Sequence, residues 1–410
     1  MAKITGPLAG HATLAGTAGN DDILASGAGN TIYGAGGDDF IGSGAGGETK
    51  VFVGAVLDGM GGARDTVRLA GPRDTLIGGD ETFRVISSGI APIIALGNGN
   101  DYVAAWGARS DITVGTGTNT VMAGPNSSVL VRSPDPGVLD VTYTDTIRFS
   151  GVGNSLVVSA YGQKYPLNGR VHVYGGSGSG NFDVNWSDGT LATSGRGNVV
   201  SAGFGTMDIR PGGGGDTVHL DPIYNTGGHS TIHLEGDHNR VDGVAGGSTI
   251  TGGTGFTSLA LDGGDAGPLS TVAIGLGGQG NNVTLTGFSG HVDAGSGHDT
   301  VRLSASFATA AFHGTGDMAF IQGGGATIDD GSSGLRIQLA DASGATTIDH
   351  FGAARGAVVD LLGSSFATAA QAFAAVATDG AGGSVLGFPT SGGIHFVGVT
   401  DLTAANFKIG

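Results

Sequence analysis

Two aspartates in the first glycine-rich stretch of the chain, Asp21 and Asp39, lie 18 residues apart in closely similar surroundings. The stretch reads GTAGNDDILASGAGNTIYGAGGDDFIG, from Gly16 to Gly42. Carboxylates combined with carbonyl oxygens are the ligands that a hard cation such as calcium takes in proteins. Two facing carboxylates without a cation would repel each other. Cation binding is therefore the first chemistry to consider, and the alternative is a flexible glycine-rich loop that happens to carry acid.

A nine-residue period predicts the elements that must position these acids. An apolar residue follows each glycine-rich hexad, and this nine-residue spacing recurs in five runs. The runs are Leu14, Ile23, Ile32 and Ile41; Val67, Leu76, Val85, Ile94, Val103, Ile112, Val121, Leu130 and Leu139; Val173, Phe182, Leu191, Val200, Ile209 and Val218; Ile232, Val241, Ile250 and Leu259; and Val283, Val292 and Val301. Each unit predicts a short strand with its central side chain inward, followed by a tight glycine turn.

Two such units form one coil of about 18 residues, and successive coils stack as parallel strands. The sequence therefore predicts an all-β protein, a right-handed parallel β-solenoid of the β-roll or β-helix type. A two-strand and a three-strand coil can share a nine-residue period, so both cross-sections stay open at this point.

The composition agrees with a repetitive β protein. The chain has 84 glycines among 410 residues, and 32 of its 35 acidic residues are aspartates, which favour turns over helices. Hydrophobic residues make up 39% of the chain, too many for a disordered linker. The absence of cysteine excludes a disulfide framework. A net charge of −17 argues against nucleic acid as a partner and suits cations.

The interruptions of the period predict a domain organisation. We expect a solenoid over residues 1–345 and a different C-terminal segment over residues 346–410, which caps the solenoid and contains a short helix. Irregular loops, where binding or assembly specificity would lie, are expected where the period breaks. These loops are predicted near residues 43–64, 131–170, 219–231 and 260–271.

The opening run resembles the RTX (repeats-in-toxin) family, whose nonapeptide is G-G-x-G-x-D-x-U-x with U apolar. The matching units are GTAGNDDIL (16–24), ASGAGNTIY (25–33) and GAGGDDFIG (34–42). Partial matches follow at GNGNDYV (97–103), GTGTNTV (115–121), GGGGDTV (212–218) and GSGHDTV (295–301). Most of the other units carry no aspartate at the sixth position, so the resemblance covers the chain as an architecture and only part of it as a strict motif.

The resemblance implies calcium between turns on the same edge of adjacent coils. Asp21 and Asp39 are sixth-position residues one coil apart, and with the turn residues Gly19 and Gly37 they form the best predicted site. Weaker predicted sites pair Asp101 with Asn119, Asn198 with Asp216, and Asn281 with Asp299. For these three pairs the alternative is a ladder without metal, in which side chains bond neighbouring backbone groups.

The end of the chain resembles the C-terminal segment of proteins exported by the bacterial type I pathway. The matching features are Ile348-Asp349-His350-Phe351, the Val359-Asp360-Leu361 step, an alanine-rich helix near Phe366–Thr378, and the ending around Gly398-Val399 to Phe407. The start, MAKITGPLAG, lacks the apolar core of a cleaved signal peptide. We therefore expect type I export and an extracellular or cell-surface location. No stretch is apolar enough to span a bilayer, so membrane insertion is not expected.

A catalytic role finds little support in the sequence motifs. No histidine is followed by glutamate, as a zinc protease would require, and the G-x-S-x-G motif of lipases is missing. Some β-solenoids are polysaccharide lyases or epimerases, which use acids, bases and arginines on one face. The residues that could serve here are His219, Asp221, Tyr224, His229, His233, Asp237, His238 and Arg240. The alternatives for this group are a solvated loop and a surface metal site.

We therefore expect a secreted bacterial structural protein that self-assembles into a surface layer, matrix or filament, binds calcium and performs no catalysis. Self-association is the main expected partnership, and cell-surface polysaccharide is a second. The alternative functions are a carbohydrate-active solenoid enzyme and an adhesin or ligand-binding rod.

Overall fold

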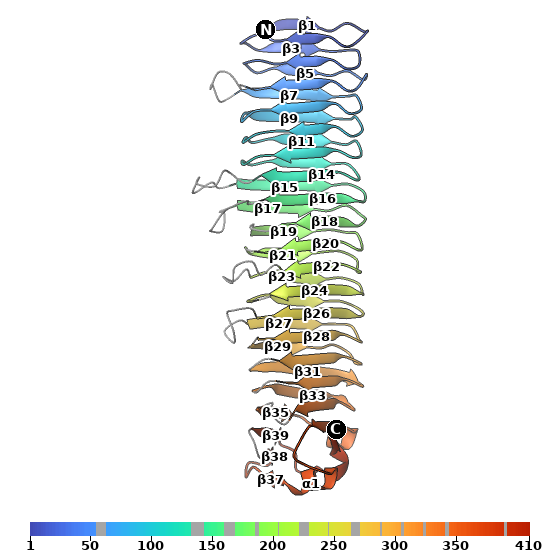
Figure 1. Ribbon diagram of the computed structural model, residues 1–410, viewed down its shortest axis with the longest axis vertical. Helices are drawn as coiled ribbons and strands as arrows, with labels where there is room; N and C mark the ends of the chain where they lie inside the picture. Colours follow the sequence, from blue (N-terminus) through green and yellow to red (C-terminus); the bar gives the residue numbers. More distant parts are fainter. Residues whose placement is uncertain are drawn as a thin grey trace. The chain divides into compact units, whose positions relative to one another are not determined.

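The computed structural model folds as two compact units, Met1–Met207 (unit 1) and Asp208–Gly410 (unit 2). It describes residues 1–54, 63–132, 143–159, 169–184, 188–203, 205–220, 229–244, 246–263, 271–287, 289–304, 307–322, 325–340, 344–388 and 392–410. Each unit is built from two parallel sheets, and consecutive strands alternate between them (Figure 1). We call these the odd sheet and the even sheet after the strand numbers. The predicted all-β solenoid architecture is confirmed, with two strands in each coil.

In unit 1 each strand pairs in parallel with the strand two places further along the chain. The odd sheet contains β1 (Ala2–Thr5), β3 (Asp21–Leu24), β5 (Phe40–Gly42), β7 (Arg64–Leu69), β9 (Thr82–Ser87), β11 (Tyr102–Ala105), β13 (Thr120–Ala123), β15 (Tyr143–Phe149), β17 (Gly169–Tyr174) and β19 (Asp188–Ala192). The even sheet contains β2 (Thr13–Ala15), β4 (Thr31–Tyr33), β6 (Lys50–Val53), β8 (Thr75–Gly78), β10 (Ile93–Ala95), β12 (Asp111–Val114), β14 (Ser128–Arg132), β16 (Asn154–Ser159), β18 (Gly180–Asp183) and β20 (Val199–Ala202).

Unit 2 repeats this arrangement. Its odd sheet contains β21 (Met207–Arg210), β23 (Thr231–Leu234), β25 (Thr249–Gly252), β27 (Thr271–Leu276), β29 (Ser289–Asp293), β31 (Ala308–Thr315), β33 (Thr327–Ser333), β35 (Ala345–Asp349) and β39 (Gly393–Val397). Its even sheet contains β22 (Thr217–Leu220), β24 (Asn239–Val244), β26 (Thr257–Asp262), β28 (Asn282–Thr286), β30 (Thr300–Ser304), β32 (Met318–Ile321), β34 (Arg336–Ala340), β36 (Val358–Leu362) and β40 (Phe407–Ile409).

The core of each unit is the apolar column that the nine-residue period predicts. Ile23, Ile41 and Val67 occupy matching positions on successive odd strands of unit 1, and each is fully buried. Ile32 and Leu76 fill the same place from the even sheet. Because one coil contributes only one or two such side chains per strand, the core forms only when coils stack.

The predicted inward position is wrong for one residue of the apolar column. Leu130 points outward and is half-buried, whereas its neighbours Val129 and Val131 are buried. The register pairs Ile112 with Val129, so this coil is one residue shorter than the usual 18. Three consecutive apolar residues leave the inward position undetermined in the sequence. Leu139 lies outside the described residues.

The predicted loops contain strands of their own. β6 lies within residues 43–64, and its Val51 is fully buried. β15 and β16 lie within residues 131–170. Longer coils are absorbed without loss of register, because Phe40 pairs directly with Thr66 in the next coil. Residues 55–62, 133–142, 160–168, 221–228 and 264–270, which make up much of the predicted loops, lie outside the described residues.

The C-terminal segment of unit 2 departs from the simple stack. Here β38 (Ser384–Gly387) pairs antiparallel with β39, and β37 (Val376–Thr378) pairs antiparallel with β38. The helix α1 (Ala369–Ala374) is shorter than the predicted Phe366–Thr378, because β37 takes up its end. The Thr368 hydroxyl caps α1 by accepting a hydrogen bond from the backbone N–H of Gln371.

α1 contacts β40 and the short 3-10 helix η3 (Ala404–Asn406), and a second 3-10 helix, η2 (Ala353–Arg355), precedes β36. No helix among the described residues is long and apolar enough to cross a membrane. The predicted boundary at residue 345 stays a prediction.

Candidate metal centre

Asp21 and Asp39 lie one coil apart, as predicted, in the turns that lead into β3 and β5. Both are buried, with 1% and 2% of their surface exposed. The Asp21 backbone N–H donates to Asp39 Oδ1 at 2.8 Å, and the Ala2 N–H donates to Asp21 Oδ1 at 2.8 Å. Each side chain therefore accepts a hydrogen bond from the backbone of the preceding coil.

The same contact repeats along unit 1. We call this series the inner ladder: a side-chain oxygen accepts from the backbone N–H at the matching position one coil earlier. Its further rungs on the odd-strand side are Asp39 N–H to Asp65 Oδ1, Phe83 N–H to Asp101 Oδ1, Asp101 N–H to Asn119 Oδ1 and Asn119 N–H to Asp145 Oδ1, at 2.8, 2.9, 3.0 and 3.0 Å. Asp101 and Asn119 thus form the ladder contact that the alternative interpretation describes.

The sequence reasoning missed Asp65 and Asp145. Each follows a long interruption and lies 26 residues after its neighbour in the ladder, so a search at a spacing of 18 passes over it. A local signal could have found them, because both stand in an Asp-Thr-apolar triplet at the start of a strand. The same triplet occurs at Asp216 and Asp299.

Asparagines in the inner ladder use both ends of the amide. Asn30 Oδ1 accepts from the Ala12 N–H at 3.0 Å, and its Nδ2 donates to the Gly27 carbonyl at 2.5 Å. Asn119 Nδ2 likewise donates to the Gly115 carbonyl at 3.0 Å. An amide therefore satisfies the preceding coil and its own turn at once.

Aspartates at this position fall into two kinds. Asp21 Oδ2 accepts from the Thr17 N–H at 2.5 Å and from its hydroxyl at 2.9 Å, so this carboxylate is fully hydrogen-bonded. In contrast, four aspartates keep one buried oxygen, Oδ2, without a hydrogen-bond partner among the described residues. These are Asp39, Asp101 and Asp145 in unit 1 and Asp317 in unit 2.

Burial raises the pKa of these unsatisfied carboxyls. The pKa of Asp39 rises to about 6, and the pKa values of Asp101 and Asp145 rise to about 7, in each case mainly through desolvation. Desolvation likewise raises the pKa of Asp65 to about 7, helped by the nearby Asp39 and Glu81. The hydrogen bond from the Thr17 backbone instead lowers the pKa of Asp21.

The predicted turn residues Gly19 and Gly37 stack on each other. Gly37 has a φ of +97°, and a Cβ on it would lie 2.6 Å from the Gly19 carbonyl carbon and 2.7 Å from the Asn20 nitrogen. Only glycine fits this turn, because the conformation and the contact both exclude a side chain. A Cβ on Gly34 would lie 2.9 Å from Asp39 Oδ2 and 3.0 Å from a methyl group of Val53, so only glycine fits beside that oxygen.

Of the remaining predicted pairs, Asn281 and Asp299 both belong to unit 2, whereas Asn198 belongs to unit 1 and Asp216 to unit 2. Asn281 N–H donates to Asp299 Oδ1 at 2.7 Å, and Asp299 N–H donates to Asp317 Oδ1 at 2.9 Å. Asp216 N–H donates to Asn239 Oδ1 at 3.2 Å. Asn198, in unit 1, accepts from the Gly180 N–H at 2.9 Å. The side chains of Asn198, Asn239, Asp299 and Asp317 each accept a backbone hydrogen bond of the inner-ladder kind.

A second ladder runs along the outside of the turns in the opposite sense. The Asn20 side chain accepts from the Asp38 N–H of the following coil at 3.0 Å, and Asp38 accepts from the Arg64 N–H at 2.8 Å. Asn98 and Asn100 accept in the same way from the following coil. We call this series the outer ladder.

The donor set decides which cation could be held. Within the described residues, no group of three or more histidine, cysteine or acidic side chains is arranged to hold a metal ion. A cation at the inner ladder would therefore need backbone carbonyls beside one carboxylate oxygen, which is oxygen-only ligation of the kind calcium takes. The buried oxygens without a hydrogen-bond partner fit that requirement, and Asp39 fits it better than Asp21.

The residues considered for catalysis in unit 2 are distributed over two sheets. His219 on β22 forms an ion pair with Asp242, which also bonds Arg240 at 2.6 Å, all on the even sheet. His233, on the odd strand β23, bonds Thr251 at 3.0 Å. His238 and Asp237 pair at 3.1 Å in the intervening turn, and the His229 ring lies 3.2 Å from the Gly247 carbonyl. Asp221 and Tyr224 lie outside the described residues.

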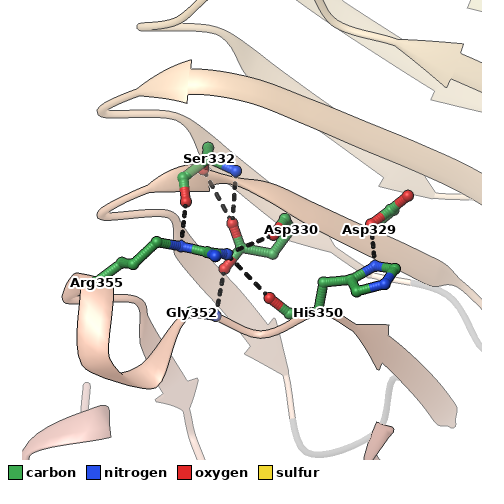
Figure 2. A network of polar contacts seen from close by, with 6 residues as sticks. All are labelled: Asp329, Asp330, Ser332, His350, Gly352 and Arg355. Carbon is green, nitrogen blue, oxygen red and sulfur yellow. Dashed lines mark hydrogen bonds and ion pairs between the residues drawn. The ribbon is translucent and has the colours of Figure 1, made fainter. Parts of the chain in front are cut away.

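The C-terminal motif that begins at Ile348 joins a polar network in unit 2 (Figure 2). Arg355 donates to the carbonyls of Asp330, Ser332 and His350 at 2.8, 3.1 and 3.1 Å. The Asp330 carboxylate accepts from the Gly352 N–H at 2.8 Å and from the Ser332 backbone and hydroxyl. These contacts tie the turn after β35 to β33, which is a structural role.

Comparisons with known proteins identify no family for this chain, so its function has to be argued from the observations above. No protein-family model matches the chain, and searches of the curated proteins and of the solved structures gave no match.

Proposed function

We propose that this chain is a calcium-stabilised structural protein of the RTX type that works outside the cell. The observation that carries the proposal is the set of buried Oδ2 atoms without a partner on Asp39, Asp101, Asp145 and Asp317. A buried carboxylate oxygen without a hydrogen bond is costly, because it has lost water and gained nothing in exchange. It must take up either a proton or a cation.

In this proposal Asp39, Asp101 and Asp145 hold calcium together with carbonyls of the adjoining glycine turns. Calcium supplies a positive charge that replaces the missing donor. Asn30 and Asn119 show which interaction the calcium ion would replace. Their Nδ2 atoms donate to turn carbonyls, whereas the aspartates have no donor at the equivalent place. One carboxylate per ion predicts weak sites, with affinities suited to the high calcium of extracellular fluids.

The extracellular location rests on the resemblance of residues 346–410 to type I export segments. The test is to fuse this segment to a passenger protein in a bacterium that carries a type I exporter. Export of the fusion, and retention of a fusion that lacks residues 346–410, are the expected results. Retention of both fusions would remove the export part of the proposal.

A structural role and self-assembly complete the proposal. Parallel stacking gives a stiff coil whose outer surface repeats from coil to coil, and such surfaces suit lateral or end-to-end association. α1 contacts β40, so another strand could be added there only if α1 moved. Electron microscopy and light scattering with calcium and with EDTA test this part, with ordered polymers expected in calcium. Monomers under both conditions would contradict it.

Calorimetry tests the calcium sites directly. Titration of the metal-free protein should show calcium uptake that falls in the triple variant Asp39→Asn, Asp101→Asn and Asp145→Asn. The matched control is Asp74→Asn, because both Asp74 oxygens already accept hydrogen bonds from Thr49, Ser43 and Gly71. Equal uptake by the wild-type protein and the triple variant would overturn the assignment.

A further inference from the structure

Unit 1 carries a surface that neither calcium nor export explains. The outward side chains of its odd sheet bring arginines and aromatic rings together over the strands β7 to β17. The residues that define this surface are Arg68, Arg84, Tyr102, Trp106, Arg148 and Tyr174, and we call it the arginine–aromatic face. Trp106 is 57% exposed and Tyr174 is 39% exposed.

The strand register aligns these side chains in columns. Arg84 pairs with Tyr102 in the next coil, and Arg148 pairs with Tyr174. The Arg84 guanidinium lies 5.8 Å from the Tyr102 ring centre, and that of Arg148 lies 4.6 Å from the Tyr174 ring centre. Arg68 lies 5.3 Å from the ring of Phe40. Cation–π contacts of this kind hold the guanidiniums against the sheet with their N–H edges free.

The charge of this face is opposite to that of the chain. The whole chain has a net charge of −17 and only 18 basic residues. Within the described part of the chain, Arg68, Arg84 and Arg148 have no carboxylate at ion-pair distance, and no described outward side chain on the odd strands β7 to β17 is acidic. On β19 these columns continue as Thr190 and Ala192, and Asp22 on β3, in register with Phe40, carries a carboxylate at the other end. These arginines are therefore available to an anionic partner.

A hollow lies in the middle of the face. It has a volume of about 590 Å³ and is lined by Trp106, Met122, Thr146 and Arg148, among others. One wall is the indole of Trp106, another is the stem of Arg148, and the threonine hydroxyl supplies a hydrogen-bonding group. An apolar ring face beside a guanidinium and a hydroxyl suits a sugar ring that carries an acid group.

We propose that the arginine–aromatic face binds an extended anionic polysaccharide along the direction in which the coils stack. The coils repeat at roughly 4.8 Å, so Arg84 on β9 and Arg148 on β15 are about 14 Å apart along the stacking direction, in neighbouring columns, with Tyr102 on β11 between them. A linear glycan with acid groups at intervals matches this alternation of charges and rings. Duplex nucleic acid carries one charge per roughly 1.7 Å, far denser than these arginines, and the overall charge of −17 repels it. The proposal does not rest on calcium binding, and it would hold if the proposed function failed.

Fluorescence anisotropy of the full-length protein with labelled alginate oligomers tests the proposal, in EDTA so that calcium cannot bridge acid groups. Binding that weakens with salt is expected, with at least a tenfold loss of affinity in the Arg84→Ala, Arg148→Ala double variant. The matched control is Arg302→Ala, which removes a similar arginine–aromatic pair, with Phe320 at 4.5 Å, on the even sheet of unit 2. This variant should bind within twofold of the wild-type protein.

Three results would overturn the proposal. They are the absence of wild-type binding to both alginate and heparin, an equal loss in the control variant, and tighter binding to single-stranded DNA of similar length than to alginate. Unchanged circular dichroism spectra of the variants would show that a loss of binding is not a loss of folding. A Tyr102→Ala variant provides an independent check, with at least a threefold loss expected from the missing ring.

Discussion

Asn30 and Asp39 occupy equivalent places at the starts of neighbouring strands in unit 1, and they differ by one functional group. Both accept a backbone hydrogen bond from the preceding coil, at 3.0 and 2.8 Å. Asn30 then donates to its own turn, whereas Asp39 presents an oxygen without a partner. The comparison shows that an amide completes the turn alone, while a carboxylate needs a proton or a cation. At this pair of places the amide of Asn30 needs neither a proton nor a cation, whereas the carboxylate of Asp39 needs one of them.

The pH dependence of stability should show the largest effect. Burial raises the folded-state pKa values of Asp39, Asp65, Asp101 and Asp145 to about 6 or 7, above the ordinary aspartate value of 3.8. Between these values the folded state binds more protons than the unfolded state, so stability falls as pH rises. In EDTA we expect the melting temperature to be highest near pH 4 to 5 and to fall until about pH 8.

Calcium should remove most of this fall at pH 8 and change little at pH 5, where the carboxyls are protonated. Differential scanning calorimetry over the pH range, in EDTA and in calcium, measures both trends. A melting temperature that rises from pH 5 to pH 8 in EDTA would contradict the assignment of the buried carboxyls.

Converting three of these four carboxyls to amides, with Asp65 left in place, should reduce that dependence. The triple variant Asp39→Asn, Asp101→Asn and Asp145→Asn gains three donors that can reach the turn carbonyls, as Asn119 does. We expect stabilisation at pH 8 in EDTA by about 1 kcal/mol per site and little change at pH 5. Chemical denaturation at the two pH values measures this difference. Destabilisation at pH 8 would show that the Oδ2 atoms have partners.

The reverse change should weaken the ladder. Asn119→Asp removes the donor to the Gly115 carbonyl and places a third carboxylate between Asp101 and Asp145. The expected cost is about 1–3 kcal/mol at pH 8, recovered at pH 5. Asn119→Ala is the control, because it loses the hydrogen bonds without adding a charge and should show no recovery at low pH.

Asp21 should respond in the opposite sense to Asp39. Its Oδ2 accepts from the Thr17 N–H and hydroxyl, so the amide of Asp21→Asn would bring a donor against a backbone donor. We expect Asp21→Asn to destabilise the protein by about 1 kcal/mol at pH 8, where Asp39→Asn stabilises it. Urea denaturation measures the change in the free energy of unfolding for each single variant. Changes of the same sign would contradict the division of these aspartates into two kinds.

The sequence predicted the repeating fold well because each coil repeats the same pattern of inward apolar and outward polar residues. It failed at Leu130, where three apolar residues in a row allowed two registers, and at Asp65 and Asp145, where long coils break the spacing. It could not distinguish Asp21 from Asp39. That distinction depends on whether the turn presents an N–H group, as Thr17 does, or leaves the oxygen unbonded, which requires the backbone conformation. The arginine–aromatic face escaped for a related reason, since its members become neighbours only in the strand register.

The opposite senses of the inner and outer ladders have a consequence for how such a chain can change. The Asp21 N–H donates forward to Asp39, while the Asp38 N–H donates back to Asn20. Coils that carry both ladders therefore meet their neighbours with the same pair of complementary contacts, one given and one received on each side. If a whole coil of this kind is deleted or duplicated, both kinds of ladder hydrogen bond can form again between the new neighbours. A deletion of part of a coil disrupts both kinds. The length of the protein is thus free to evolve in whole coils.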